Sequence, residues 1–438
     1  MNEPQAVDLR IDAPWIVPVE PAGALKDHAL IVDQGVIVAL VPAADAARDY
    51  APREHVALAN HIVLPGLVNA HTHGAMSLMR GIADDVPLQP WLTGHIWPRE
   101  GRFVSAEFVH DGTLLAAAEM LLGGVTCCSD MYFHPDAAAR AYQAAGMRAM
   151  LGVPVLDFPT PYAADADAYL QAGLAARDAF RHADTLAFSL APHAPYTVGD
   201  ATFGKIVTLA RELDLPIQTH LQETRGELDD ALRDTGASPL ARLDRLGATG
   251  PAFVAVHAVH PGPGDADLLA AQHCHVVHCP ASNLKLASGI APIADYLARG
   301  INVALGTDGA ASNNRLDVFC EMRLAALLAK GATGDAAVLP ASTALRMATR
   351  NGALALGFET ACGALVPGLQ ADFIAVTLDG AAQTPCYDPV SHLVHVAGRD
   401  QVREVWVKGR RVVQGGRLTT LDEDSVVARA SVWRERLQ

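Results

Sequence analysis

The sequence predicts an α/β protein: a TIM-type (β/α)8 barrel with a small β-sandwich domain built from both chain termini. Three observations point to this fold. Short apolar, β-branched runs alternate with Ala- and Leu-rich stretches of helical period along the middle of the 438-residue chain. Eight such runs follow one another, as expected for parallel strands that are buried on both faces and close into a barrel. Residues 1–64 and 367–438 break this rhythm with short strands and turns.

Residues 65–366 are assigned to the barrel, and an open doubly wound sheet is the alternative that the same rhythm allows. The predicted strands are rich in apolar and β-branched residues and cover residues 62–70, 124–131, 149–156, 185–192, 215–221, 252–258, 274–280 and 301–308. The clearest helical stretches cover residues 105–124, 165–180, 198–214 and 315–331, and an added helix covers 340–357.

The two flanking segments, residues 1–64 and 367–438, are expected to pair into one small β-sandwich. In the first segment two apolar runs meet at the turn Asp33-Gln34-Gly35, and in the second the turn Lys408-Gly409 takes the same place. The last stretch, residues 425–438, has the pattern of a terminal helix.

Composition and charge exclude several classes of protein. The chain has 33 Lys and Arg against 48 Asp and Glu, a formal charge of −15, and shows no basic cluster for a nucleic-acid backbone. No apolar run approaches the roughly 20 residues that span a bilayer. The seven cysteines form no Cys-x-x-Cys pair, and no export signal precedes the first strand. We therefore expect a cytoplasmic protein with reduced thiols and without nucleic-acid or membrane partners.

Polar residues at the ends of the predicted strands point to a metal site. In a (β/α)8 barrel the carboxyl ends of the strands converge on one place. His71 and His73 end the first strand on the same side, His220 ends the fifth and Asp308 the eighth. Three imidazoles and a carboxylate suit one divalent ion, with Zn²⁺ preferred over Fe²⁺ or Mn²⁺ and a water in the open position.

Other polar residues near the same ends are candidates for catalysis. Glu223 lies just beyond His220 and, in an apolar site, could act as a general acid. Asp308 could take the proton of an attacking water. His257 ends the sixth strand and could hold that water, but His260 in the same run competes for this role, and spacing does not decide between them. His193 ends the fourth strand.

Each of these residues alone has a simpler explanation. A single buried histidine is more often part of a core than a ligand, Asp308 could cap a turn, and Glu223 could be a solvated residue at a helix start. The joint pattern favours a metal site, because unrelated histidines would not all fall at strand ends. No Lys ends the fourth or fifth strand to bridge a second metal ion, and the His-x-Glu and Pro-Cys-x-x-Cys signature of cytidine deaminases is absent.

Several segments of the chain together resemble the amidohydrolase superfamily. They are LPGLVNAHTHGAMSLMRG, DMYFHP, APHAPYTV, THLQET, CPASNLKLASGIAP, GTDGAASNN and GALVPGLQADFIAV. The resemblance is strongest to the 5-methylthioadenosine/S-adenosylhomocysteine deaminases, in a group often described as chlorohydrolase-like, and it covers nearly the whole chain. Guanine, cytosine and triazine hydrolases share the metal core, so the resemblance specifies the superfamily more sharply than the substrate.

The resemblance implies roles for the catalytic candidates. The residues that match the family's zinc ligands are His71, His73, His220 and Asp308. Glu223 matches the residue that protonates N1 of the purine and shuttles protons. His257 matches the histidine that orients the hydroxide.

The resemblance also implies contacts with a nucleoside. Glu100 matches the glutamate that holds the ribose hydroxyls, His193 a histidine that contacts the nucleoside, and Ser312 lies where the family approaches the base. A loop over residues 76–100, with Trp91 and Trp97, would cover the nucleoside; ordinary packing under the barrel rim is the alternative for this apolar stretch.

One segment departs from the family pattern. Some members carry an arginine at the end of strand three, suited to the amino-acid carboxylate of S-adenosylhomocysteine. Here that strand ends with Val153 and Pro154, and Arg148 starts it, so it should lie at the far end. An apolar wall suits a methylthio group better than a zwitterion, because an unpaired carboxylate is costly to bury.

The sequence therefore predicts a hydrolytic deaminase of adenine nucleosides, in which zinc-bound hydroxide attacks C6 and ammonia leaves. Methylthioadenosine and adenosine are preferred over S-adenosylhomocysteine as substrates. The alternatives are another ring amidohydrolase, for guanine, pterin, cytosine or triazine rings, and a catalytically inactive barrel that acts as a scaffold. Whether the protein forms a homo-oligomer is left open.

Overall fold

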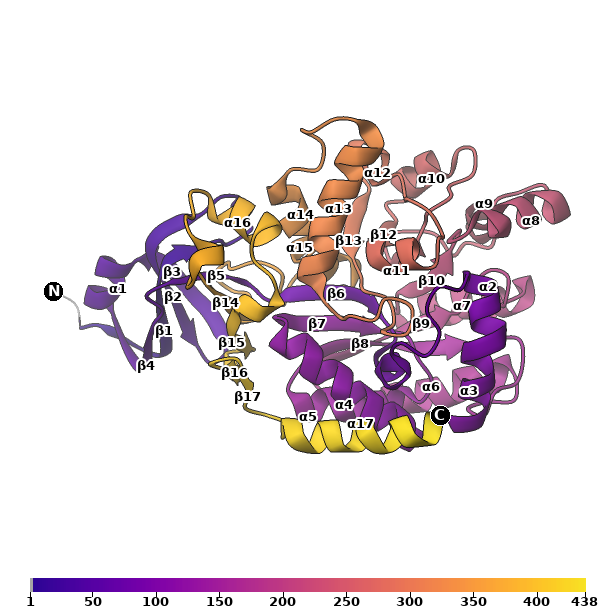
Figure 1. The fold of residues 1–438 in the computed structure, drawn as a ribbon, viewed down its shortest axis with the longest axis horizontal. Coiled ribbons are helices and arrows are strands. Elements are labelled where there is room, and N and C mark those ends of the chain that lie inside the picture. Colours follow the sequence, from indigo (N-terminus) through magenta and orange to yellow (C-terminus); the bar gives the residue numbers. More distant parts are fainter. Residues whose placement is uncertain (1–2) are drawn as a thin grey trace.

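The computed structural model describes residues 3–438, and these form two β-sheets with helices around the larger one. In Figure 1 the smaller sheet lies to the left of the barrel, and indigo strands from the start of the chain lie beside yellow strands from its end. Strand β5 pairs with β14 across more than 300 residues of sequence. The predicted fold class, a (β/α)8 barrel with a small β-sandwich domain built from both chain termini, is confirmed; the strands of the small domain form one mixed sheet.

The barrel sheet has eight strands whose hydrogen-bonded order runs without interruption from β13 to β6. Neighbouring strands are parallel throughout. The strands are β6 (Leu67–Thr72), β7 (Val125–Asp130), β8 (Arg148–Val155), β9 (Leu186–Pro192), β10 (Ile217–Leu221), β11 (Phe253–His257), β12 (His275–His278) and β13 (Asn302–Leu305). They match the predicted strands in order and position.

The seam between the first and last barrel strands is held by one side chain and one loop amide. The buried Asn69 side chain on β6 donates to Thr307 Oγ1 at 2.8 Å and accepts from the Thr307 amide at 2.9 Å. The amide of Asp308 donates to the carbonyl of His71 at 3.0 Å. This seam therefore fixes the distance between the end of β6 and the segment after β13.

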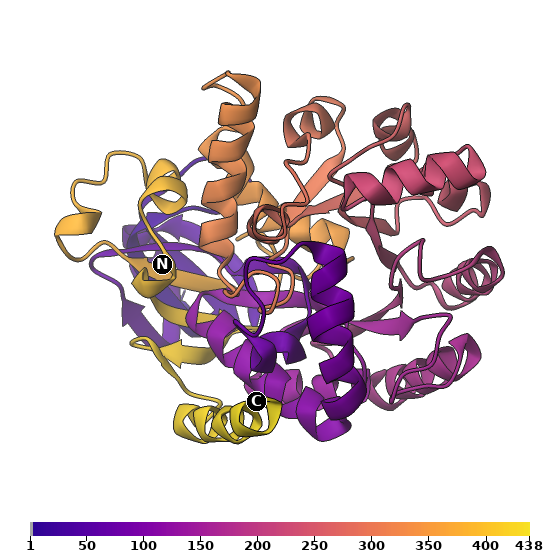
Figure 2. The same cartoon turned by 45° about the vertical axis from the view of Figure 1, so that its right-hand side comes forward.

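Helices cover the outside of the barrel (Figure 2). They are α4 (Ala106–Leu122), α5 (Pro135–Ala145), α6 (Ala166–Phe180), α7 (Asp200–Leu213), α8 (Arg225–Thr235), α9 (Pro239–Arg245), α10 (Asp265–Ala271), α11 (Pro280–Lys285), α12 (Ile293–Ala298), α13 (Val318–Thr333), α14 (Ala341–Met347) and α15 (Arg350–Ala355). Among residues 3–438, no helix has the length and apolar character needed to cross a membrane.

The predicted terminal helix is α17 (Glu423–Leu437), which runs along the outside of the barrel against α4 (Figure 1). Its Trp433 indole donates to Asp111 Oδ2 at 3.0 Å, and its ring meets Phe108 edge-on. The terminal helix thus packs on the outside of the barrel.

The smaller sheet has nine strands in one mixed sheet. They are β1 (Gln5–Ile16), β2 (Leu25–Asp33), β3 (Val36–Pro42), β4 (Tyr50–Ala57), β5 (His61–Pro65), β14 (Phe373–Thr377), β15 (Val402–Val407), β16 (Arg410–Gln414) and β17 (Arg417–Leu418). The connecting helices are α1 (Ala43–Asp49), η3 (Ala381–Gln383), α16 (Pro389–His395) and η4 (Arg399–Gln401). Phe373 and Trp406 stack in its core with ring centroids 4.4 Å apart.

The predicted strand over residues 62–70 is two strands, because the chain changes sheets at Gly66. β5 belongs to the smaller sheet and β6 to the barrel. A Cβ atom at Gly66 would lie 2.0 Å from Thr126 Oγ1, so only glycine lets the chain pass β7 at this point. The continuous apolar run concealed this break.

A buried ion pair joins the base of the barrel to the smaller sheet. Arg148, the first residue of β8, lies with its Nε 2.9 Å from Asp372 Oδ2, and both side chains are 1% exposed. Asp372 directly precedes β14 and also accepts from the Lys408 amide. The expectation that Arg148 lies at the end of its strand away from the catalytic candidates is confirmed.

The segment between β6 and α4 is helical where a loop was expected over residues 76–100. Its helices are η1 (Gly74–Met79), α2 (Leu88–Trp91), η2 (Leu92–Ile96) and α3 (Trp97–Phe103). η2 is one turn of π-helix between α2 and α3, a form that often occurs at functional sites. Figure 2 shows α2 and α3 in front of the barrel.

Candidate active site

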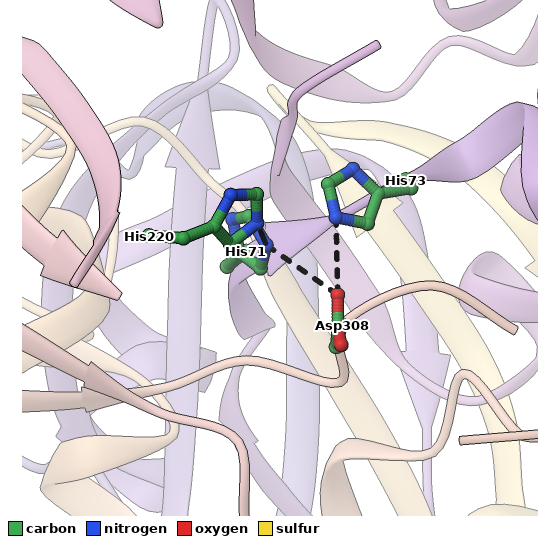
Figure 3. A group of neighbouring side chains, drawn as sticks. All are labelled: His71, His73, His220 and Asp308. Carbon is green, nitrogen blue, oxygen red and sulfur yellow. Dashed lines mark hydrogen bonds and ion pairs between the residues drawn. The ribbon is translucent and has the colours of Figure 1, made fainter. Parts of the chain in front are cut away.

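Four side chains converge at the carboxyl ends of the barrel strands (Figure 3). His71 lies on β6, His73 directly after it, His220 on β10 and Asp308 after β13. Their ligand atoms all lie within 4.8 Å of one another. Asp308 Oδ1 is 3.1 Å from His73 Nε2 and 3.5 Å from His71 Nε2, and His71 Nε2 is 3.2 Å from His220 Nε2.

Each imidazole of this cluster has an acceptor on its outer nitrogen. His73 Nδ1 donates to the Met131 carbonyl at 2.5 Å, and His220 Nδ1 donates to the His193 carbonyl at 2.7 Å. His71 Nδ1 donates to Gln218 Oε1 at 3.3 Å. Because these acceptors place the ring hydrogen on Nδ1, the lone pairs of the Nε2 atoms face the cluster, as a metal ion requires.

The amide of Gln218 is itself oriented by its neighbours. Its Oε1 accepts from Ser129 Oγ at 3.1 Å, and its Nε2 donates to the Ala70 carbonyl at 3.2 Å. The side chain therefore presents oxygen, not nitrogen, to His71. Gln218 lies two residues before His220 on β10, and alternation along the strand puts both on the same side.

The two carboxylate oxygens of Asp308 have different partners. Oδ1 faces the imidazoles, whereas Oδ2 accepts from Ser282 Oγ at 2.6 Å and Ser312 Oγ at 2.7 Å. The residue has a φ of 60°, a left-handed backbone that turns its side chain toward the cluster. Ser312 also lines the adjoining cavity, so its expected place near the base stays a prediction.

The protonation states suit cation binding. Burial lowers the pKa of His71 to about 4, so this ring is neutral at physiological pH. Burial opposes charge on His73 as well, but the hydrogen bond and charge of Asp308 raise its pKa to about 9. Burial works against the Asp308 carboxylate, yet its contacts with His71 and His73 keep its pKa well below the usual range. A cation that binds here therefore displaces a proton from His73.

Glu223 and His257 lie beside the cluster. Glu223 Oε2 is 3.7 Å from His257 Nε2, and Glu223 Oε1 accepts from Ser288 Oγ at 3.1 Å. Burial, reinforced by the charge of Asp308, raises the pKa of Glu223 to about 8, so the carboxyl holds a proton at neutral pH. His257 Nδ1 donates to Asn283 Oδ1 at 2.8 Å, which leaves its Nε2 free toward the cavity.

The two histidines that competed for one role on strand six lie in different surroundings. His257 lines the cavity, and its ring stacks at 5.6 Å on that of His220. His260 Nε2 lies 2.6 Å from the Ser288 carbonyl and does not line the cavity. The geometry thus favours His257.

A cavity of about 240 Å³ opens above the cluster and is mainly apolar. Helices α2, η2 and α3 form one wall, to which Trp91 and Trp97 contribute. Glu100 lies in the same wall and accepts from Tyr132 Oη at 2.7 Å; burial raises the pKa of this carboxyl, although the hydrogen bond opposes the shift. His193 also lines the cavity, and burial lowers its pKa to about 3.

Three carboxyl groups line this cavity, those of Glu100, Glu223 and Asp308. The other ionisable lining groups are four histidines, of which His73 has a raised pKa, and two tyrosines. Among the described lining residues none is Lys or Arg. The segment that follows β8 contributes Leu156, Phe158 and Pro159, an apolar patch next to Trp97.

Some residues of the site escaped prediction from the sequence. Tyr132, Gln218, Asn283 and Ser288 each hold one of the catalytic candidates. Gln218 had a signal in its spacing from His220, and Tyr132 lies in the segment DMYFHP that carried the resemblance. Asn283, in helix α11, and Ser288, in the turn after it, lie in the segment CPASNLKLASGIAP that also carried the resemblance, but neither residue was singled out.

A (β/α)8 barrel with this cluster of three imidazoles and a carboxylate defines a metal-dependent barrel protein. The sequence profile of the Amidohydrolase family matches residues 62–412. The chain belongs to this family, as the sequence predicted.

Individual relatives match this chain over nearly their whole length. A 5-methylthioadenosine/S-adenosylhomocysteine deaminase of Teredinibacter turnerae is 46% identical, and the match covers 100% of this chain and 99% of the relative. A crystal structure of an adenosine deaminase from Xanthomonas campestris with bound zinc is 45% identical, with a TM-score of 0.97 over 99% of both chains. An atrazine chlorohydrolase from Arthrobacter aurescens complexed with zinc is 25% identical, with a TM-score of 0.90 over 97% of this chain and 100% of that one.

The prediction of one divalent metal ion as cofactor is confirmed by the donor cluster and the family. The donors present fit it: neutral Nε2 lone pairs, one ionised carboxylate oxygen and occupied outer nitrogens. The assignment of individual side chains as ligands stays a proposal.

The hydrogen bond from His71 to Gln218 can be tested through metal affinity. Replacing Gln218 with Met removes the acceptor that fixes the His71 ring, so we expect zinc affinity to fall about 10- to 100-fold. Competition with a chromophoric chelator measures it. Gln171→Met, at an exposed position of α6, is the matched control and should leave affinity unchanged. Equal affinity in both variants would contradict the role of Gln218.

Proposed function

We propose that this protein is a zinc-dependent hydrolase that deaminates adenine nucleosides at C6 and releases ammonia. The observation that carries the proposal is the Glu223 carboxyl, protonated at neutral pH, in the same buried cavity as the donor cluster. Relatives that are 5-methylthioadenosine/S-adenosylhomocysteine and adenosine deaminases by name support the substrate class. We place the enzyme in the cytoplasm with a small-molecule substrate and no nucleic-acid partner; a homo-oligomer is compatible with this function.

The residues that would hold the metal are His71, His73, His220 and Asp308. Bound there, a zinc ion lowers the pKa of a coordinated water to about 7 and so supplies a nucleophile at neutral pH. The reaction forms a C6–O bond and breaks the bond between C6 and the exocyclic nitrogen.

Proton transfer in this scheme falls to the chain's own carboxyls. Glu223 donates its proton to ring N1, which makes C6 more electrophilic. Asp308 Oδ1 takes one proton of the water, and Glu223 takes the proton that remains on the C6 hydroxyl and passes it to the leaving amino group. The proton on Asp308 then returns to Glu223, which restores both carboxyl groups. His257 Nε2, 3.7 Å from Glu223 Oε2, accepts a hydrogen bond that orients the water. The products are an inosine-type nucleoside and ammonia.

We assign the recognition of the sugar to Glu100, whose carboxylate can accept from both ribose hydroxyls. Tyr132 holds this carboxylate in place. Trp91 supplies an apolar surface for the flat base, and His193 and Ser312 lie on the remaining sides of the cavity. These contacts would align C6 with the cluster.

We further propose that the preferred 5′ substituent is small and uncharged, as in methylthioadenosine or adenosine. The segment after β8 is apolar, and no Lys or Arg among the described lining residues could pair with an amino-acid carboxylate. Burying that carboxylate without a partner would cost several kcal/mol. S-adenosylhomocysteine is then a poorer substrate.

An ammonia-release assay over a substrate panel tests the function. With zinc-loaded protein we expect turnover of methylthioadenosine and adenosine, and kcat/KM about tenfold or more lower for S-adenosylhomocysteine because its carboxylate lacks a partner. Guanine and cytosine are the comparison rings and should release no ammonia. Activity on a free base alone would contradict the nucleoside assignment.

Substitution of Glu223 separates proton transfer from metal binding. Glu223→Gln keeps the shape but removes the titrating proton, so we expect kcat to fall by at least about 100-fold while zinc content stays at one ion per chain. Metal analysis and ammonia release measure the two effects. Glu212→Gln, on the exposed face of α7, should retain wild-type turnover. Retention of more than a few per cent of activity in Glu223→Gln would overturn the role.

Glu100 distinguishes a nucleoside enzyme from a hydrolase of free rings. Glu100→Ala removes the proposed acceptor for the ribose hydroxyls, and kcat/KM for nucleosides should fall about 10- to 100-fold. A triazine or free-base hydrolase on the same metal core would show no such loss. Equal kcat/KM for methylthioadenosine in wild type and variant would therefore favour that rival. A protein with every ligand but no stoichiometric metal after chelator-free purification would instead favour an inactive scaffold.

A further inference from the structure

The loop that carries Glu223 and the loop that follows His257 are joined by hydrogen bonds. Gln222, next to Glu223, donates from its side chain to the His260 carbonyl at 3.0 Å and to Asp265 Oδ2 at 2.7 Å. The Gln222 carbonyl accepts from the amides of Val259 and His260 at 3.1 and 3.0 Å. These hydrogen bonds therefore link the two loops directly.

The Glu227 carboxylate holds the other side of the same loop. Its Oε1 accepts from the Gln222 amide at 3.0 Å, and its Oε2 accepts from the Glu223 amide at 3.0 Å. One side chain thus binds the main chain of the proposed acid directly. No other partner of these two amides is found among the described residues.

This contact differs from ordinary capping of α8. Thr224 is the N-cap of the helix, and its hydroxyl accepts from the Glu227 amide at 3.3 Å. A glutamate at the third helical position usually returns to the amide of the N-cap residue itself. Here the Glu227 side chain extends past Thr224 to the amides of the two preceding residues, so it stabilises the loop rather than the helix.

The loop needs these hydrogen bonds because part of its backbone has an unfavourable conformation. Gln222 has a φ of 50°, a left-handed conformation that costs a residue with a side chain about 1–3 kcal/mol. The Glu223 side chain has Ser288 Oγ as its hydrogen-bond partner, at 3.1 Å. The position of its carboxyl in the cavity therefore depends on the main chain that carries it.

We propose that Glu227 is a positioning residue that fixes the main chain of Glu223 and, through Gln222, its alignment with His257. The inference rests on the proposed function only in that Glu223 transfers the proton. Glu227 does not line the cavity and touches no substrate.

Activity of Glu227 variants is the first part of the test. We expect Glu227→Ala to lower kcat about 100-fold, the effect of a misplacement of about 1 Å, with KM for methylthioadenosine within about threefold of wild type. Glu227→Gln keeps one acceptor oxygen and should restore part of the loss. Zinc content and Tm are measured alongside. If Glu227→Ala does not fold, the kcat of Glu227→Gln tests the proposal instead.

Hydrogen exchange is the second part and needs no turnover. In Glu227→Ala the amides of Gln222 and Glu223 should exchange at least about tenfold faster than in wild type, because their acceptor is gone. Thr224→Ala is the matched control: it removes the N-cap acceptor but leaves both loop amides bonded to Glu227, so kcat and exchange at these amides should stay near wild type.

The outcomes separate the two claims. Unchanged kcat in Glu227→Ala, or an equal loss in Thr224→Ala, would show that Glu227 only stabilises α8 and would overturn the inference. A wild-type protein that releases no ammonia from any nucleoside would contradict the proposed function instead. Exchange at the Gln222 and Glu223 amides would still decide whether Glu227 holds the loop.

Discussion

The arrangement of the site depends on lone pairs from three imidazoles that meet one carboxylate oxygen. Neutral histidine has two tautomers, and only the one with hydrogen on Nδ1 leaves Nε2 free. Carbonyl oxygens behind His73 and His220, and the Gln218 amide behind His71, impose that tautomer. All three acceptors lie on other barrel strands or directly after them, so the closed barrel itself prepares the cluster.

The seam of the barrel has a second consequence for the cluster. His71 and His73 come from one side of it and Asp308 from the other, and Asn69 holds the two sides in register. A cation bound between them would add a link across the same seam. Metal binding and closure of the barrel therefore stabilise each other, and a change in the seam would alter the spacing of the donors before it altered the rest of the barrel.

The sequence predicts the barrel strands and the donor cluster well for a physical reason. Buried parallel strands must be apolar, and a polar residue at the end of such a run stands out, as His220 does in IQTHL. The break at Gly66 could not be predicted, since both halves of that run are buried in different sheets. Helices α2 and α3 were also missed, because their apolar residues face a cavity rather than follow one periodic stripe.

The sequence patterns do not predict the contacts that hold the proposed catalytic groups in place. Asn283 reaches the site from the short helix α11 and Ser288 from the turn after it, and Glu227 reaches back over the start of its own helix. Such contacts produce no periodic pattern in the sequence, because a single residue with left-handed backbone, such as Gln222, changes the direction of the chain. The carboxyl of Glu223, the proposed acid, is thereby placed chiefly through its main chain. Its own side chain keeps a single hydroxyl partner, so it is free to exchange its proton with a ligand in the cavity.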